Sequence, residues 1–272
     1  MSHPRIAVFA RSATGNARPV RSIEGQGTKI ARTMHGIVYD ELHDEIVVTN
    51  PFAEAILFFR GGTNGEEAPI RIIQGPNTFL KSPDTLAVDP EHDEVFVILR
   101  RQGAILVFQR DASGDAAPLR ILRGPKTQLT SPMRVAVDPQ NDLLVVGNRS
   151  PGRLLVFNRT DEGDVEPKVV IEGPKTGIIY PQAVQVYPPR KEIIVAVTDT
   201  TPAHRERRAK PGFIGVWNYT DHGDVPPKAM IKGPDSMLIR PRGVALNAKD
   251  KEIYVVDRIG NSLFTFHFPQ IF

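Results

Sequence analysis

The side chains of this chain that could do chemistry carry oxygen or nitrogen, because the sequence contains no cysteine. Thiol nucleophiles, disulfides and thiolate-bound zinc are therefore excluded. Carboxylates, amides, a histidine and an arginine instead stand beside short apolar runs, at positions that recur along the chain. Such donors suit a divalent cation or a small polar ligand. The candidate ligand-binding residues at these positions are His35, Asn50, Asp84, Asn148, Gln182, Arg242 and Asp257, and Asp199 is a further candidate outside the recurring positions.

These positions recur because the chain repeats itself. The segment "SPDTLAVDPEHDEVFVILRRQGAILVFQR" at residues 82–110 is followed 49 residues later by "SPMRVAVDPQNDLLVVGNRSPGRLLVFNR". The apolar phrase that closes each repeat begins at Ile6, Ile56, Ile105, Leu154, Ile214 and Leu263. A fixed period of this size, sustained from end to end, is typical of a repeat architecture.

Each repeat predicts four short strands. In one repeat, runs rich in Val, Ile, Leu and Phe cover residues 85–89, 94–99, 104–110 and 117–124, separated by turns rich in Pro, Gly and Asp. Four antiparallel strands per repeat predict a β-propeller blade. The first strand occurs five times. The expected fold class is therefore all-β, with residues 1–272 forming one five-bladed propeller of four-stranded antiparallel blades.

One repeat carries a family pattern. The segment "RPRGVALNAKDKEIYVVDRIGNSLFTF" at residues 240–266 resembles the NHL repeat in its Pro, Gly-Val-Ala, Ile-Tyr-Val, Asp, Asn and closing aromatic residue. The resemblance extends over essentially the whole chain in five copies, although NHL propellers more often have six. The second copy has "ILRRQGA" where the Asp and Asn of the pattern would stand. The fourth copy, "VQVYPPRKE", lacks the Asp that the pattern has after Gly-Val-Ala. The resemblance implies an NHL-like propeller and says little about activity.

The order of the strands predicts how the ring closes. The chain begins with the third and fourth strands of a blade and ends with the first three. Because propellers leave no open edges, residues 19–25 are expected to complete the last blade beside residues 263–268. The surplus segment at residues 5–10 is expected to form a hairpin with residues 19–25 as a fifth, outermost strand. Alternatively, it meets the edge of a second copy and makes a homo-oligomer.

The candidate residues allow two interpretations. In propellers, the loops before the first strand and after the second emerge on one face around the central channel. A polar mouth there would hold a cation or a polar ligand through His35, Asn50, Asp84, Asn148 and Asp257, with Arg242 as an anion contact. In the other interpretation, Asp and Asn at strand ends cap turns and bind loop amides.

Two enzyme families similar to NHL propellers can be compared at these positions. Lactonases related to regucalcin and gluconolactonase bind a divalent metal through Glu, Asn and Asp near the inner strands. Here Met133, Gln182 and Arg242 occupy three of the five positions, which disfavours that site. An amidating lyase with a related propeller binds zinc through histidines. Only His35 and His204 are expected near the mouth, and zinc needs at least three protein ligands.

One insertion breaks the period. The segment "TDTTPAHRERRAKPGF" at residues 198–213 adds about eleven residues between the second and third strands of the fourth repeat. Its basic residues could contact an anionic ligand or an acidic protein, or they could form a solvated loop. No aromatic residues are interleaved with them, so no nucleic acid partner is expected. The basic candidates are Arg205, Arg207 and Arg208.

Composition gives little further guidance. The net charge is +3, and no apolar run is long enough for a membrane-spanning helix. The first residues, "MSHPRIAVFARS", lack the apolar stretch of a signal peptide. The lack of cysteine fits a cytoplasmic protein and the mature form of an exported bacterial protein equally well, so the compartment stays open.

The sequence favours a non-catalytic NHL-like module that binds a protein or a small polar ligand at the channel mouth, without a cofactor. The alternative is a divalent-metal-dependent hydrolase or lyase, lactonase-like, with its site in the same mouth. No Gly-x-Ser-x-Gly nucleophile motif is present.

Overall fold

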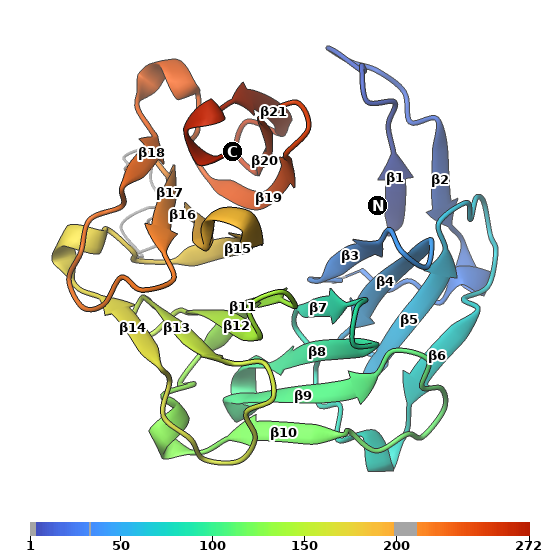
Figure 1. Ribbon diagram of the computed structural model, residues 1–272. Helices are drawn as coiled ribbons and strands as arrows, with labels where there is room; N and C mark the ends of the chain where they lie inside the picture. The colour runs from blue at the N-terminus through green and yellow to red at the C-terminus, as the bar shows by residue number, and fades with distance from the viewer. Residues whose placement is uncertain (1–3, 33, 199–210) are drawn as a thin grey trace. The chain divides into compact units, whose positions relative to one another are not determined.

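The computed structural model describes residues 4–32, 34–198 and 211–272 (Figure 1). Within these ranges the chain consists of strands, short 3-10 turns and loops, with no α-helix. The strands form antiparallel sheets: β1 (Arg5–Val8) and β2 (Arg21–Glu24); β3 (Ile37–Asp40), β4 (Glu45–Asn50), β5 (Ala55–Arg60) and β6 (Arg71–Gln74); β7 (Leu86–Asp89), β8 (Glu94–Leu99), β9 (Ala104–Gln109) and β10 (Arg120–Arg123); β11 (Pro132–Asp138), β12 (Leu143–Asn148), β13 (Arg153–Asn158) and β14 (Val169–Glu172); β15 (Pro181–Tyr187), β16 (Glu192–Val197), β17 (Phe213–Asn218) and β18 (Ala229–Ile231); β19 (Pro241–Asn247), β20 (Glu252–Asp257) and β21 (Ser262–His267).

The fold is an all-β, five-bladed β-propeller, as the repeats predict. In the first four blades the strands lie side by side in chain order. The chain forms two compact units, which we call unit 1 (residues 1–99 with 106–120) and unit 2 (residues 100–105 with 121–272). Each unit has its own apolar core.

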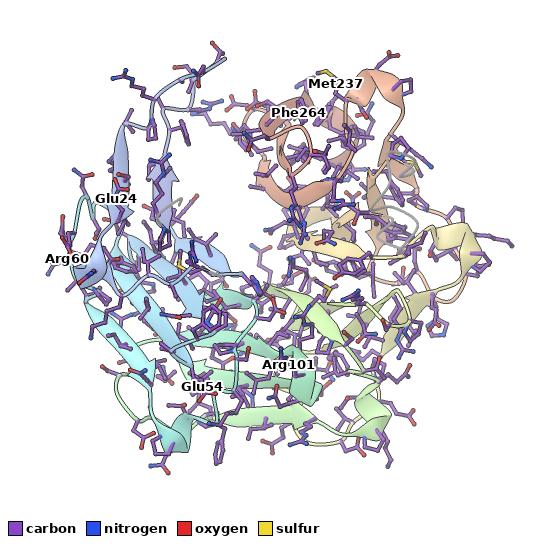
Figure 2. All side chains as sticks on the ribbon, turned by 180° about the vertical axis from the view of Figure 1, so that it is seen from behind. Glu24, Glu54, Arg60, Arg101, Met237 and Phe264 are labelled. Carbon is purple, nitrogen blue, oxygen red and sulfur yellow. The ribbon has the colours of Figure 1, made fainter. Side chains whose placement is uncertain are left out.

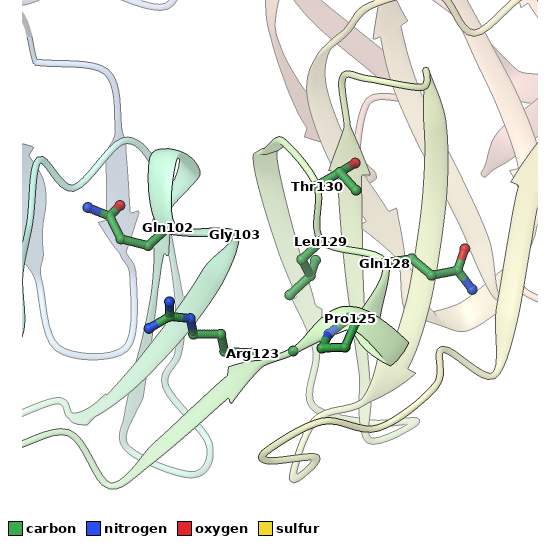
Figure 3. Close-up of a pocket in the computed structure, with 8 residues that line it drawn as sticks. Gln102, Gly103, Arg123, Pro125, Gln128, Leu129 and Thr130 are labelled. Atoms are coloured by element: carbon green, nitrogen blue, oxygen red, sulfur yellow. The ribbon is translucent and has the colours of Figure 1, made fainter.

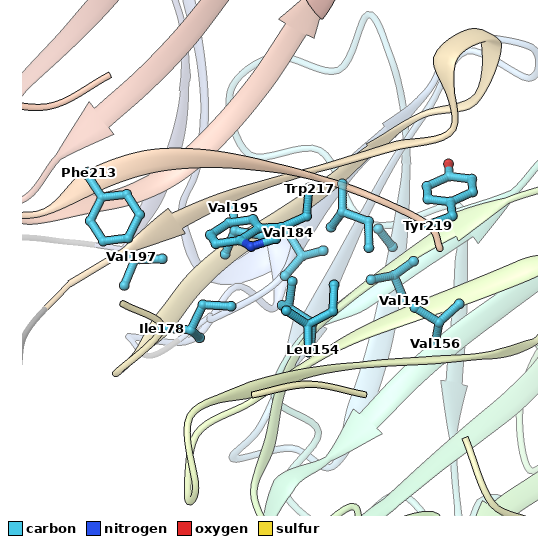
Figure 4. Packing of buried hydrophobic residues seen from close by; sticks show 13 residues of the cluster. Val145, Leu154, Val156, Ile178, Val184, Val195, Val197, Phe213, Trp217 and Tyr219 are labelled. Atoms are coloured by element: carbon cyan, nitrogen blue, oxygen red, sulfur yellow. The ribbon is translucent and has the colours of Figure 1, made fainter. Parts of the chain in front are cut away.

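In the first four blades the second strand is buried on both faces, which explains its nearly continuous apolar sequence. All six residues of β16 in unit 2 are buried. Ile193 and Val195 pack with Val145 of the preceding blade, whereas Ile194 packs with Ile253 of the following blade. Alternate side chains of a strand point to opposite faces, so β16 contributes to two cores at once. Figure 4 shows the first of these cores, around Trp217.

A short 3-10 turn precedes the first strand of each blade, and four of these five turns stand at the recurring "GP" motif of the sequence. In unit 1, Gly75 has a φ of 146°, and the N–H of Asn77 donates to Asp115 Oδ1 of the next blade over 2.7 Å. A Cβ on Gly75 would lie 2.3 Å from that oxygen, so only glycine fits. The same carboxylate contact recurs twice in unit 2. The turns are η1 (Gln26–Thr28), η2 (Pro76–Thr78), η4 (Pro125–Thr127), η5 (Pro174–Thr176) and η8 (Pro234–Ser236), and the other 3-10 turns are η3 (Arg100–Gln102), η6 (Pro188–Arg190) and η9 (Pro269–Ile271).

The expected N-terminal hairpin is confirmed. Strand β1 pairs with β2 in antiparallel register, with Arg5 opposite Glu24 and Val8 opposite Arg21. Ile23 is fully buried and forms a parallel bridge with Gly65, the same bridge that the fourth strand of other blades makes with the next blade. β2 therefore occupies the place of a fourth strand before blade one. Assembly of two copies through β1 stays a prediction.

Within the described residues, the last sheet of unit 2 consists of the three strands β19, β20 and β21, and in unit 1 β2 pairs with β1. Ile23 of β2 is fully buried within unit 1. Closure of the last blade by β2 stays a prediction.

A buried ion-pair network fixes the start of β4 in unit 1. The guanidinium of Arg71 donates two hydrogen bonds to the carboxylate of Glu45, over 2.6 and 2.7 Å, and Arg110 donates a third over 3.1 Å. Burial alone would raise the pKa of Glu45, but the hydrogen bonds and charges of Arg71 and Arg110 hold it below its ordinary value of 4.5. Glu45 is therefore ionised at neutral pH and is shared by two arginines, of which Arg110 also pairs with Asp93 over 2.7 Å.

Replacing Glu45 with Gln should lower the free energy of unfolding by about 3 kcal/mol, because the partly buried Arg71 loses its carboxylate partner and Arg110 keeps only Asp93. Because the pKa of Glu45 is depressed in the folded state, this contribution is complete above its ordinary pKa and is lost as the pH falls through the folded pKa. Denaturant titrations at several pH values should therefore show the difference from wild type shrinking below pH 4.5.

The matched control is Glu54→Gln. Glu54, labelled in Figure 2, pairs with Lys81 over 2.8 Å, and both side chains are exposed. Its loss should cost less than about 1 kcal/mol. Equal effects of the two substitutions would contradict the role assigned to the buried network.

Candidate functional site

In unit 2 the second residue of the first strand of each blade lies at a β-bulge. Pro132 faces Asn148 across the ladder and Arg134 faces Gly147, so Met133 is an extra residue. The register shifts in the same way at Gln182 and at Arg242. A bulge disrupts the ladder locally and re-aims a side chain. The three positions that the sequence aligns are therefore aligned in backbone geometry as well.

The residues that end the second strand bind their own loops. In unit 2 the amide oxygen of Asn148 accepts the N–H of Ser131 over 2.8 Å, and its amide nitrogen donates to Thr130 and Pro151 over 3.0 Å each. In unit 1 Asn50 likewise donates to the carbonyl of Lys29. These side chains satisfy loop groups, as the turn-capping interpretation predicts.

Asp257 in unit 2 makes the same contacts with a carboxylate. One of its oxygens accepts the N–H groups of Ile239 and Arg240, over 2.8 and 2.6 Å, and the other accepts two N–H groups of the following turn, each over 2.9 Å. Four amide donors occupy this buried carboxylate. Its geometry favours a structural cap over a cation ligand.

His35 and Asp84 meet in unit 1. His35 Nδ1 lies 3.1 Å from Asp84 Oδ1, and the imidazole is 45% exposed while the carboxylate is buried. Thr49 Oγ1 donates to the carbonyl of Asp84, which fixes the backbone of this segment. A carboxylate behind an exposed imidazole orients the ring, an arrangement that can accept a proton or bind a polar group.

Gln182 is the centre of a second group, in unit 2. Its side chain is fully buried, its amide nitrogen donates to Thr198 over 3.2 Å, and its amide oxygen accepts from Arg242 over 3.0 Å. Arg134 donates through Nε to the backbone carbonyl of Gln182. Guanidiniums from the two flanking blades therefore converge on one glutamine.

Two further arginines stand near Arg242. Burial lowers the pKa of Arg242, and the charges of Arg258 and Arg240 lower it further. Sequence reasoning missed Arg134, Arg240 and Arg258. The signal was present in the "RPR" of residues 240–242 and in the arginine that follows Asp257, but only the ladder shows that these segments are adjacent.

Within the described residues, no group of three or more His, Asp or Glu side chains could hold a metal ion. A pocket of about 220 Å³ lies in unit 2 beside η3 and η4 (Figure 3). None of the predicted site residues lines it. Its lining residues are Gln102, Gly103, Arg123, Gly124, Pro125, Gln128, Leu129 and Thr130.

Four predicted site residues lie outside the described residues: Asp199, Arg205, Arg207 and Arg208. In the part of the chain that the structure describes, no helix is both long and apolar enough to cross a membrane.

Comparisons with known proteins support the propeller. Residues 53–180 match the family described as "Lactonase, 7-bladed beta-propeller". Among solved structures, the chain is similar to one from the nidogen/laminin complex, with 14% identity, a TM-score of 0.59, and coverage of 88% of this chain and 77% of that chain. At this identity the likeness shows the fold alone. The search of curated proteins finds no match. These findings confirm the resemblance to propeller proteins.

Replacing Asn148 with Ala should lower the free energy of unfolding by about 2 kcal/mol, because three loop groups lose their buried partner. Thermal or denaturant unfolding measures the effect. Asn64→Ala is the control, since Asn64 is exposed and should change stability by less than about 0.5 kcal/mol. If Asn148→Ala were as stable as wild type, the capping role would be wrong and a ligand role would regain support.

Proposed function

We propose that this chain is a non-catalytic binding propeller that recognises a protein or a small polar ligand at the channel-mouth face predicted from the sequence. The observation that carries the proposal is that three of the polar candidates cap their own loops, whereas Arg242 and His35 do not. Asn50, Asn148 and Asp257 use their oxygens on backbone amides, so they leave no ligand set for a metal.

The polar groups that are not turn caps suit recognition. Arg242 presents a cation, and His35 presents a half-exposed imidazole held by a carboxylate. Both donate hydrogen bonds to polar or anionic groups. The similar solved structure belongs to a complex of two proteins, nidogen and laminin, so a propeller of this shape occurs in a protein assembly. The sequence also predicts three basic residues for this binding face: Arg205, Arg207 and Arg208.

A second candidate function is lactone hydrolysis. It is favoured by the match of residues 53–180 to the lactonase family and by the pair of His35 and Asp84. In that reaction His35 would act as a general base that takes a proton from water, and Asp84 would orient its ring. A divalent metal would need ligands beyond the caps already described.

The deciding experiment measures binding and turnover on the same full-length preparation. Binding of sugars, organic acids and phosphate esters is measured by thermal shift and then by calorimetry. Hydrolysis of a panel of lactones is measured with and without a chelator. We expect reversible binding of a polar ligand and no lactone turnover above the buffer rate.

The variants separate the two functions. If lactone turnover is seen and His35→Asn abolishes it while Glu54→Gln does not, the protein is a hydrolase and the binding proposal is overturned. Loss of turnover on chelation would assign a metal to that reaction. If no panel member binds and none is hydrolysed, the small-ligand form of the proposal is also refuted.

A further inference from the structure

The entry to β19 in unit 2 gathers three positive charges at one end of a hairpin. Pro241 and Asp257 are partners across the β19–β20 ladder, and the N–H of Arg258 donates to the carbonyl of Arg240 over 3.0 Å. Arg240 and Arg242 flank Pro241 on the other strand. The β19–β20 ladder therefore holds the backbones of Arg240, Arg242 and Arg258 close to one another.

The single negative charge of Asp257 is too small to balance the three arginines. Asp257 lies among the three arginines, but its oxygens accept four backbone N–H groups. No ion pair joins Arg240, Arg242 or Arg258 to a carboxylate of the described residues. Three positive charges thus stand against one negative charge that is already occupied by amides.

Arg242 is the member whose side chain is hydrogen-bonded to Gln182. It sits at the bulge of β19, and its one hydrogen bond within the described residues goes to Gln182, whose own amide is fixed by Thr198. Its Nε is buried without a hydrogen-bond partner. Burying a guanidinium beside two others is unfavourable in isolation, and burial is the first cause of its lowered pKa. The Arg242 side chain as a whole is partly exposed, so an anion beside it would supply the missing negative charge.

We propose that Arg242, with Arg240 and Arg258, binds an oxyanion of a small ligand beside Gln182, namely a carboxylate or a phosphate group. A guanidinium binds a carboxylate or a phosphate through paired N–H donors, so the arginines fit either group. This inference rests on the proposed binding function and names the class of ligand for it.

The test titrates the full chain with sodium phosphate and, separately, with sodium acetate at constant ionic strength, followed by calorimetry. We expect one saturable site for at least one of the two ions, and the ion that binds more tightly identifies the group. Arg242→Gln should weaken that binding about tenfold or more, through loss of a charge-assisted hydrogen bond. Arg101→Gln is the control and should bind as wild type, since Arg101 is an exposed arginine of η3 (Figure 2).

A second variant keeps the test decisive if Arg242→Gln does not fold. Gln182→Glu places a carboxylate where the amide oxygen now lies, 3.0 Å from Arg242. This internal anion should abolish phosphate and acetate binding while leaving the melting temperature unchanged or higher. Wild-type protein that binds neither ion, or variants that bind as wild type does, would overturn the anion site.

Failure of this inference can be told apart from failure of the proposed function. If a ligand from the panel binds wild type and Arg242→Gln equally, the binding function stands and the oxyanion site is wrong. If the protein hydrolyses lactones, the binding proposal fails, and the phosphate and acetate titrations still decide whether the arginines bind an anion.

Discussion

The structure depends on the burial of both faces of the second strand in the first four blades. A sheet whose middle strands are apolar on both sides cannot be stable alone, because one face would stay in water. In unit 2, β16 shares its side chains between two neighbouring cores. Each blade is therefore stable only beside its neighbours. Each repeat of about 49 residues supplies one such blade.

Polar contacts then set the register between blades. Tyr219 donates to the buried carboxylate of Asp138 over 2.6 Å, and burial together with this hydrogen bond raises the pKa of the phenol. The glycine turns are held in a similar way by carboxylates of the next blade, such as Asp164 against Lys126 N. These groups are buried with partners, so they specify how neighbouring sheets align.

The same physics explains why polar candidates were ambiguous in the sequence. An Asn or Asp at a strand end has the same identity whether it caps a loop or faces a ligand. Asn148 bonds an N–H, a hydroxyl and a carbonyl of its own loops, and Asp257 accepts four backbone N–H groups, whereas Arg242 donates to Gln182 from a bulge. The positions were predictable from the period, but the direction of each side chain depended on contacts between segments far apart in the chain.

The sequence by itself determined the number of repeats, the four-strand pattern, the turn chemistry and the N-terminal hairpin, because these follow from local alternation and from glycine and proline. The tertiary structure decided which polar groups are already bound and which charges are brought together. Arg240 and Arg258 are 18 residues apart in the chain and become neighbours only across a ladder. The spacing of residues in the sequence does not show whether a polar side chain is already hydrogen-bonded, because its partners lie in loops that come together only in the folded chain.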